Sequence, residues 1–174
     1  YGHVPKKYFL TQIGKAKIVK KGKDITVVAF SYAVIEVLKC IKILKENKID
    51  IELIDLRTLR PLDNKSIINS VKKTGRLLVI DNSWTTYGIC AEIISLVVES
   101  IGLKLKSPPK RIGIKNVSIP SSRAISKYCY TNPFEIIESI SKITKIDLNL
   151  NKIRKSIMNQ ENSDIPYADF KGPF

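Results

Sequence analysis

The sequence is poor in the side chains that most often carry catalysis or bind metals, since its only histidine is His3. Its three cysteines, Cys40, Cys90 and Cys129, are far apart and have no second cysteine or histidine at ligand spacing. This pattern argues against a zinc site, a disulfide framework and a cysteine nucleophile with a histidine base. We expect three reduced thiols.

Long apolar runs are also missing. No stretch approaches the roughly 20 consecutive apolar residues of a membrane span, and the start, YGHVPKKYFL, lacks the apolar centre of a signal peptide. The sequence therefore predicts a soluble chain without a membrane partner. Its 174 residues, 44% of them hydrophobic, suffice for one domain with a substantial core.

Acidic residues are scarce relative to basic ones. The chain has 16 Asp and Glu but 30 Lys and Arg, which gives a net charge of +14. This balance suits nucleic acid, an anionic membrane or an acidic protein as partner. The lysines are spread along the whole chain, however, and no aromatic residues interleave with them as a base-stacking platform requires. The pattern favours a solvated basic face over a nucleic-acid site, and a basic binding module without enzyme activity stays open as an alternative.

Apolar runs and helical periodicity alternate along the first half of the chain. Residues 25–30 (ITVVAF) are typical of a strand buried on both faces, and we take them as the first strand of the domain. Apolar side chains at three- and four-residue spacing then predict an amphipathic helix that begins directly after Ser31 and ends near Asn47. Residues 49–54 (IDIELI) follow as a second strand, which indicates a right-handed parallel crossover.

The same unit repeats further along. Asp63 is a suitable N-cap for a helix that stops at Gly75, ahead of a strand at 76–80. A short strand is expected at 110–114, and Asn132, followed by proline, is a strong start signal for a further helix.

The remaining segments carry weaker signals. Residues 115–131 read as irregular, and LNKIRKSIM near the end predicts a short amphipathic helix. We expect the tail beyond it either to be extended and docked through Tyr167, Phe170 and Phe174 or to be disordered.

Residues 89–101 are apolar on most sides, with Glu92, Ser95 and Glu99 as a narrow polar face. A helix of this kind is hard to cover within one small domain. We therefore expect a subunit or domain interface that includes Ile93 and Val97.

The alternation of strands and helices predicts an α/β fold with an open, mostly parallel sheet and helices on both faces. Ligands of such sheets bind beyond the carboxyl ends of the strands. At one such end, Asp55, Arg57 and Arg60 could clamp a phosphate or carboxylate and serve an anion-sensing module. A structural loop, in which Asp55 pairs with an arginine, explains the same residues and is favoured.

The next strand leads into Trp84 and Tyr87, ahead of a helix whose first amides could receive an anion. The two rings could wall a ligand or pack against a neighbouring domain, and packing is the more common use. No strand end carries a GxGxxG or GxxxxGK[ST] cradle, and no paired carboxylates or metal-ligand cluster complete a catalytic set.

Five motifs in order resemble the C-terminal domain of the transketolase family, closest to the beta subunit of the 2-oxo acid (pyruvate) dehydrogenase decarboxylase component. They are Ile13-Gly14-Lys15-Ala16-Lys17, KGKDITVVAFS, IDLRTLRPLD, SVKKTGRLLVID and the helix start Gly88-x-x-Ala91-Glu92-Ile93. The later IPSSRAISKYCYTNPFEIIESI is similar to the loop, turn and final helix of the same domain. The resemblance covers about residues 4–144 and implies a five-stranded sheet.

The resemblance implies a role within a larger thiamine-diphosphate enzyme, in which magnesium helps to bind the cofactor. That enzyme decarboxylates a 2-oxo acid and transfers the acyl unit to lipoamide, and the catalytic and cofactor-binding residues of the beta chain lie in a preceding pyrimidine-binding domain. We expect that domain to be encoded upstream of Tyr1, residues 1–24 to lead in from it, residues 25–145 to form the C-terminal domain and residues 146–174 to extend it. No catalytic, cofactor-binding or metal residue is therefore expected here, and no thiamine diphosphate or magnesium bound by this chain alone.

The implied partners are an alpha subunit, a second beta subunit and the acyltransferase core of the complex. The implied compartment is the cytoplasm of a bacterium, or the mitochondrial matrix or plastid of a eukaryote.

Overall fold

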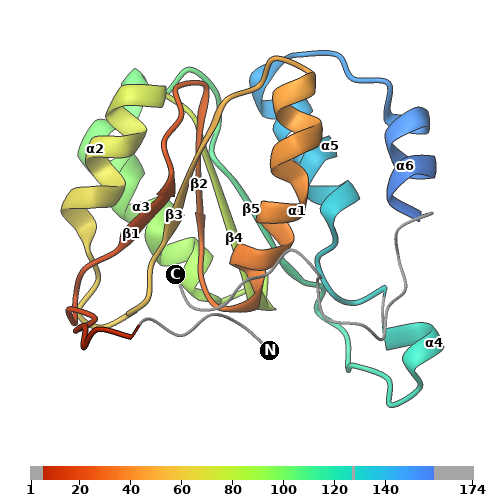
Figure 1. Cartoon of the computed structure of the whole chain (residues 1–174), viewed down its shortest axis with the longest axis horizontal. Coiled ribbons are helices and arrows are strands. Elements are labelled where there is room, and N and C mark those ends of the chain that lie inside the picture. The colour runs from red at the N-terminus through yellow and green to blue at the C-terminus, as the bar shows by residue number, and fades with distance from the viewer. Residues whose placement is uncertain (1–5, 127, 159–174) are drawn as a thin grey trace.

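The computed structural model of the chain describes residues 6–126 and 128–158, which form an α/β fold with a central sheet between two layers of helices (Figure 1). The strands are β1 (Lys17–Lys20), β2 (Ile25–Ala29), β3 (Ile51–Asp55), β4 (Leu77–Trp84) and β5 (Lys110–Ile114). The helices are α1 (Tyr32–Glu46), α2 (Asn64–Thr74), α3 (Ile89–Ile101), the 3-10 turn η1 (Gly102–Lys104), α4 (Arg123–Ser126), α5 (Pro133–Thr144) and α6 (Leu150–Met158). The predicted contacts of Tyr167, Phe170 and Phe174 lie outside the described residues.

The sheet has five strands in the order β1-β3-β2-β4-β5. Every neighbouring pair is parallel except β1 and β3, so the expected open, mostly parallel sheet is confirmed. In the centre, Val27 of β2 lies beside Leu53 on one side and Leu78 on the other. Of the three βαβ units, β2-α1-β3 places its helix on one face, whereas β3-α2-β4 and β4-α3-β5 place theirs on the other, which is the doubly wound arrangement.

The expectation that residues 25–30 form the first strand is wrong, because β1 precedes them. This strand is at the edge of the sheet, and its burial ranges from exposed to half-buried. Its sequence, KIVK, has a lysine at each end and no long apolar run. An edge strand of this kind gives a weak local signal, because its position depends on pairing with β3.

Two separate apolar cores hold the helices to the sheet. Val27 and its neighbours on one face contact α1, α5 and α6, whereas Val28 and Ile54 on the other face contact α2 and α3. All five residues of β2 are buried, which explains why its sequence is continuously apolar rather than alternating. Figure 1 shows α2 and α3 on one side of the strands and α1, α5 and α6 on the other.

The predicted helix boundaries at both caps are confirmed. Asp63 accepts a hydrogen bond from the Ser66 amide, and Gly75 ends α2 in the left-handed conformation at φ 75°. Asn132 accepts from the Glu135 amide at 3.0 Å, with proline in the first turn of α5. The segment expected to be irregular contains the short helix α4. Within the described ranges, no helix is long and apolar enough to cross a membrane.

Candidate subunit interface

The carboxyl ends of the four parallel strands lie along the lower edge of the molecule in Figure 1. The segments that leave these ends, or that lead into α5 beside them, expose large apolar side chains. We define the carboxyl-edge surface by Tyr32, Leu59, Trp84, Tyr87, Val117, Ile119, Tyr128 and Tyr130, all at least 43% exposed. Single exposed apolar residues are common, but eight large ones along one edge favour a protein contact.

Trp84 and Tyr87 are the most prominent members of this surface. Trp84, the last residue of β4, is 59% exposed, and Tyr87 is 100% exposed. The loop that carries them is anchored to the end of β5. Both the amide and the hydroxyl of Thr85 donate to the Ile114 carbonyl, at 2.9 and 3.1 Å. A Cβ at Gly88 would lie 2.3 Å from the Trp84 carbonyl oxygen, so only glycine permits this close turn.

Arg57 and Arg60 lie on the loop after β3. The Arg57 amide donates to Asp55 at 3.2 Å, and the Nε of its side chain lies 3.8 Å from the same carboxylate. Burial raises the pKa of Asp55 and outweighs the Arg57 amide bond and the charges of Arg57 and Lys17. Arg60 is exposed and precedes a cis bond to Pro61. The Asp55–Arg57 pair supports the structural interpretation of this loop.

The segment before β1 is attached to this same loop, which sequence patterns did not predict. The Gly14 amide donates to the Thr58 hydroxyl at 3.1 Å, and a Cβ at Gly14 would lie 2.8 Å from Pro61. The Ala16 amide donates to Asp63 at 3.1 Å. The motifs around residues 13–17 and 54–63 are thus in direct contact. The one available signal was Gly14, whose φ of 74° favours glycine.

The prediction for α3 needs correction. Ile93 and Val97 are 0% exposed and belong to the core between α2, α3 and the sheet, so neither side chain reaches the surface. The outer side of the helix presents Val98, which is 42% exposed, together with polar residues. Periodicity showed that α3 is apolar on most sides. Ile94 and Leu96 are partly buried within the chain, which accounts for much of this wide apolar surface.

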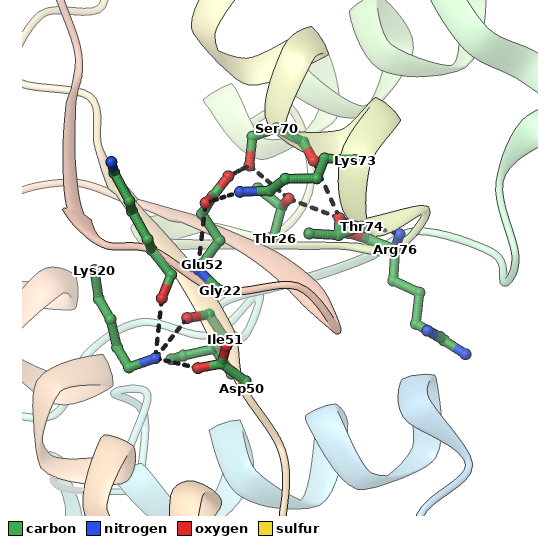
Figure 2. Close-up of polar contacts among 11 residues, drawn as sticks. Lys20, Gly22, Thr26, Asp50, Ile51, Glu52, Ser70, Lys73, Thr74 and Arg76 are labelled. Atoms are coloured by element: carbon green, nitrogen blue, oxygen red, sulfur yellow. Dashed lines mark hydrogen bonds and ion pairs between the residues drawn. The ribbon is translucent and has the colours of Figure 1, made fainter.

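At the opposite edge of the sheet, a buried carboxylate organises a polar network that sequence reasoning missed. Glu52 of β3 is 1% exposed, and Figure 2 shows Gly22, Ser70 and Lys73 directed toward it. The Gly22 amide donates at 3.3 Å, and the Ser70 hydroxyl and Lys73 ammonium form short contacts. Burial alone would raise the pKa of Glu52, but these donors outweigh it and lower the pKa.

The network continues from Ser70 into the sheet. Its hydroxyl lies 2.7 Å from that of Thr26 in β2, and the Thr26 hydroxyl lies 2.8 Å from that of Thr74 (Figure 2). Three neighbouring elements are thereby joined through buried polar groups. Each of these groups has a partner, as burial of a polar side chain requires.

Comparison with known proteins identifies the family of this arrangement. Residues 14–135 match the family described as "Transketolase, C-terminal domain". The chain belongs to the transketolase C-terminal domain family. In this transketolase C-terminal domain the matched region begins at Gly14, which contacts Pro61, and ends in the first turn of α5.

The similar proteins include beta subunits of the pyruvate dehydrogenase E1 component. That of Acholeplasma laidlawii is 39% identical over 142 residues, which are 82% of this chain and 43% of that protein. The subunit of Rickettsia felis is 36% identical over 146 residues (82% and 45%), and the mitochondrial subunit of Dictyostelium discoideum is 35% identical over 139 residues (80% and 39%). The transketolase C-terminal domain described here thus spans less than half the length of these relatives.

Among solved structures, a split-gene transketolase described as an inactive beta4 tetramer has a similar fold. The TM-score is 0.65 at 21% identity, over 83% of this chain and 48% of that chain. The expected fold and the resemblance to the beta subunit are therefore confirmed.

The family resemblance implies a cofactor that the whole enzyme binds with the help of magnesium. In residues 6–126 and 128–158, no three His, Cys, Asp or Glu side chains gather into a group that could hold a metal ion. The two buried thiols are unsuited to act as nucleophiles, because burial raises the pKa of Cys40 well above its usual value and that of Cys90 to about 12. No catalytic step is assigned to this transketolase C-terminal domain.

Proposed function

We propose that the chain is the subunit-assembly domain of the beta subunit of a thiamine-diphosphate-dependent 2-oxo acid dehydrogenase. The whole enzyme would decarboxylate a 2-oxo acid and pass the acyl unit to lipoamide, using the cofactor and magnesium held by other domains. This proposal rests on the similarity to pyruvate dehydrogenase E1 beta subunits over 82% of the chain. Its partners would be an alpha subunit, a second beta subunit and the acyltransferase core.

The observation that carries the assembly role is the carboxyl-edge surface. Trp84 and Tyr87 stand on a loop that is held by backbone bonds, so little conformational entropy would be lost when a partner covers the rings. Burial of apolar surface contributes about 25 cal/mol per Å², and aromatic residues at the centre of an interface carry a large share of its energy. A rigid loop with two exposed rings is well suited to this purpose.

The proposal is tested by sedimentation equilibrium of the chain, up to the highest soluble concentration. We expect self-association that is weakened at least about tenfold by Trp84→Ser with Tyr87→Ser, a loss of about 1.4 kcal/mol. Leu103→Ser is the control, because Leu103 is at least as exposed as either ring but lies at the opposite edge. A chain that remains monomeric throughout, or a double variant that associates like the wild type, would overturn the assembly role.

Calorimetric titration with thiamine diphosphate and magnesium tests the second part. We expect no binding to this chain, because the described residues offer no metal-ligand group. Saturable binding with the affinity of a whole enzyme would contradict the proposal that other domains hold the cofactor and magnesium. The basic alternative is tested with a short DNA duplex at low ionic strength, where strong salt-dependent binding would favour it over the assembly role.

A further inference from the structure

An apolar groove lies at the edge of the sheet opposite the carboxyl-edge surface. It is formed where α3 ends and the chain turns through η1 toward β5, and its apolar lining comes from Val98, Gly102, Leu103, Leu105, Pro108 and Pro109. Leu103 projects fully into solvent, with an exposed fraction of 105%, and Val98 is 42% exposed. We call this feature the amino-edge groove. Nothing in the proposed subunit contact covers it.

Lysines are frequent along this edge of the sheet because of the topology. The four parallel strands begin at this edge, and the segments that lead into them are residues 20–24, 45–50, 72–76 and 102–109. The exposed lysines in these segments are Lys21, Lys23, Lys45, Lys48, Lys72, Lys73, Lys104 and Lys106. The only exposed carboxylate in the same segments is Glu46.

Glu99, in the last turn of α3, is also exposed, but three further carboxylates near this edge are used inside the fold. Asp50 pairs with Lys20 at 2.5 Å, Asp24 accepts the Asp50 amide at 2.7 Å, and Glu52 is buried against Lys73. The edge therefore carries a large excess of positive charge at its surface. Such a field attracts an anionic partner and speeds its association.

Helix ends explain part of this pattern but not all of it. Lys45, Lys72 and Lys73 lie in the last turns of α1 and α2, where a cation interacts favourably with the helix dipole. Lys104 is the last residue of the short turn η1 and directly follows the exposed Leu103, whereas Lys106 lies outside any helix and lines the groove together with Leu103. Lys106 is held in place, since its ammonium donates to the Thr74 carbonyl at 3.3 Å and its amide donates to the Gly75 carbonyl at 2.8 Å.

We propose that the amino-edge groove binds an acidic peptide segment of a partner protein through apolar anchors in the groove and carboxylates on Lys104 and Lys106. An apolar groove with lysines beside it fits a peptide that combines acidic and apolar residues. A nucleic acid would use the lysines but leave the apolar lining without a function. The groove and the carboxyl-edge surface lie at opposite edges, so both can be occupied together. This inference does not depend on the proposed enzyme.

Fluorescence anisotropy with three labelled peptides tests the proposal: EDLEELLDEF, its apolar-free form EDSEESSDES and the basic form KKLKKLLKKF. We expect EDLEELLDEF to bind at low ionic strength at least about tenfold more tightly than EDSEESSDES. The basic peptide should not bind. Leu103→Ser should weaken binding of EDLEELLDEF about tenfold, and the pair Lys104→Glu with Lys106→Glu should do the same and reduce its salt dependence.

The matched control is Lys152→Glu with Lys155→Glu, which makes the same charge change on exposed positions of α6. We expect this control to retain most of the affinity. Because all the substituted side chains are exposed, an unchanged melting temperature will show that the variants remain folded.

Equal affinity for EDLEELLDEF and EDSEESSDES, or an equal loss of affinity in the α6 control, would overturn the proposal that the groove binds an acidic peptide. Tighter binding of a DNA duplex that Leu103→Ser leaves unchanged would assign the edge to nucleic acid instead. A shift of the self-association equilibrium by Leu103→Ser would show that a second copy covers it.

Discussion

Asp63 accepts a hydrogen bond from the Ala16 amide at 3.1 Å while the same carboxylate caps α2 through the amide and hydroxyl of Ser66. One side chain therefore fixes the segment that enters the domain to the first turn of a helix 47 residues later. This contact explains why the motifs around residues 13–17 and 54–63 occur together in the sequence. Each motif stabilises the conformation of the other.

Asp63→Ala should lower the free energy of unfolding by about 2 kcal/mol, since it removes an N-cap and leaves the Ala16 amide without its acceptor. Urea denaturation measures the loss, and the exposed Asp147→Ala is the control. Burial alone would raise the pKa of Asp63, but the hydrogen bonds from Ser66 and Ala16 and the charge of Lys15 outweigh it and lower the pKa.

The sign of the pH dependence follows from that direction. A carboxyl whose folded pKa is depressed stabilises the fold above its unfolded value of about 3.9, and this contribution disappears as the pH falls through the folded pKa. The difference between wild type and Asp63→Asn should thus be constant near neutral pH and shrink in acid. A difference that grows below about pH 4 would contradict the assignment.

The buried Glu52 network gives a second prediction. Glu52→Ala should cost about 3 kcal/mol, because Gly22, Ser70 and Lys73 lose their shared acceptor in a buried site. Lys73→Met should cost about 1 kcal/mol or less, since the Lys73 side chain is 48% exposed and its pairing is screened by water. Chemical denaturation compares both with Glu46→Ala, which removes an exposed carboxylate at the end of α1. Equal losses for Glu52→Ala and Glu46→Ala would show that the network contributes nothing.

Sequence patterns predicted those elements that local signals determine. The apolar run of β2, the cap of α2 at Asp63 and the Asn132-Pro133 start of α5 all occur where expected. Features that depend on distant partners were missed. Glu52 looked like an ordinary polar residue in a strand, because its acceptor role depends on Gly22 before β2 and on Ser70 in α2.

The error at α3 has the same origin. Helical periodicity identifies an apolar helix. Which of its sides are buried depends on how α3 packs against α2 and the sheet, and the local sequence gives no information on that packing. Ile93 and Val97 therefore turned out to be core residues, whereas Trp84 and Tyr87, predicted as possible ligand or domain contacts, are exposed. Loop residues after a buried strand are constrained to the surface, so their exposure is easier to predict.

Substitution by alanine should reduce stability by different amounts at two glycines, because different contacts surround them. A Cβ at Gly22 would lie 2.2 Å from the backbone of Ile51, so Gly22→Ala should cost roughly 3 kcal/mol or more, or prevent folding. At Gly102 nothing lies within 4 Å, and only its backbone conformation, with φ +44° and ψ −119°, opposes a side chain. Gly102→Ala should then cost about 1–3 kcal/mol. Thermal unfolding distinguishes them, and a larger loss at Gly102 would contradict the packing at Gly22.

The three thiols should differ in reactivity. Cys40 is 0% exposed and Cys90 is 3% exposed, and burial raises the pKa of both, helped at Cys90 by the charge of Asp81. Cys129 is only half-buried. Titration of the native chain with a disulfide reagent near pH 8 should therefore show one fast thiol, absent in Cys129→Ser, and all three after unfolding. A second fast thiol in the native chain would show that one of the cores opens readily.

Tyr87 combines full exposure with a left-handed backbone at φ 60°, a conformation that glycine adopts more easily than tyrosine. Tyr87→Gly should leave the stability of the isolated chain unchanged or raise it by up to about 1 kcal/mol, because relief of backbone strain opposes the greater entropy of the unfolded chain. If the ring serves subunit assembly, the same change should weaken self-association at least about tenfold. Lys48→Gly is the matched control, since Lys48 is exposed at φ 61° on the opposite edge and should show the same effect on stability with no effect on association. Calorimetry and sedimentation equilibrium separate the two effects, and a Tyr87→Gly chain that associates as strongly as the wild type would remove this ring from the interface.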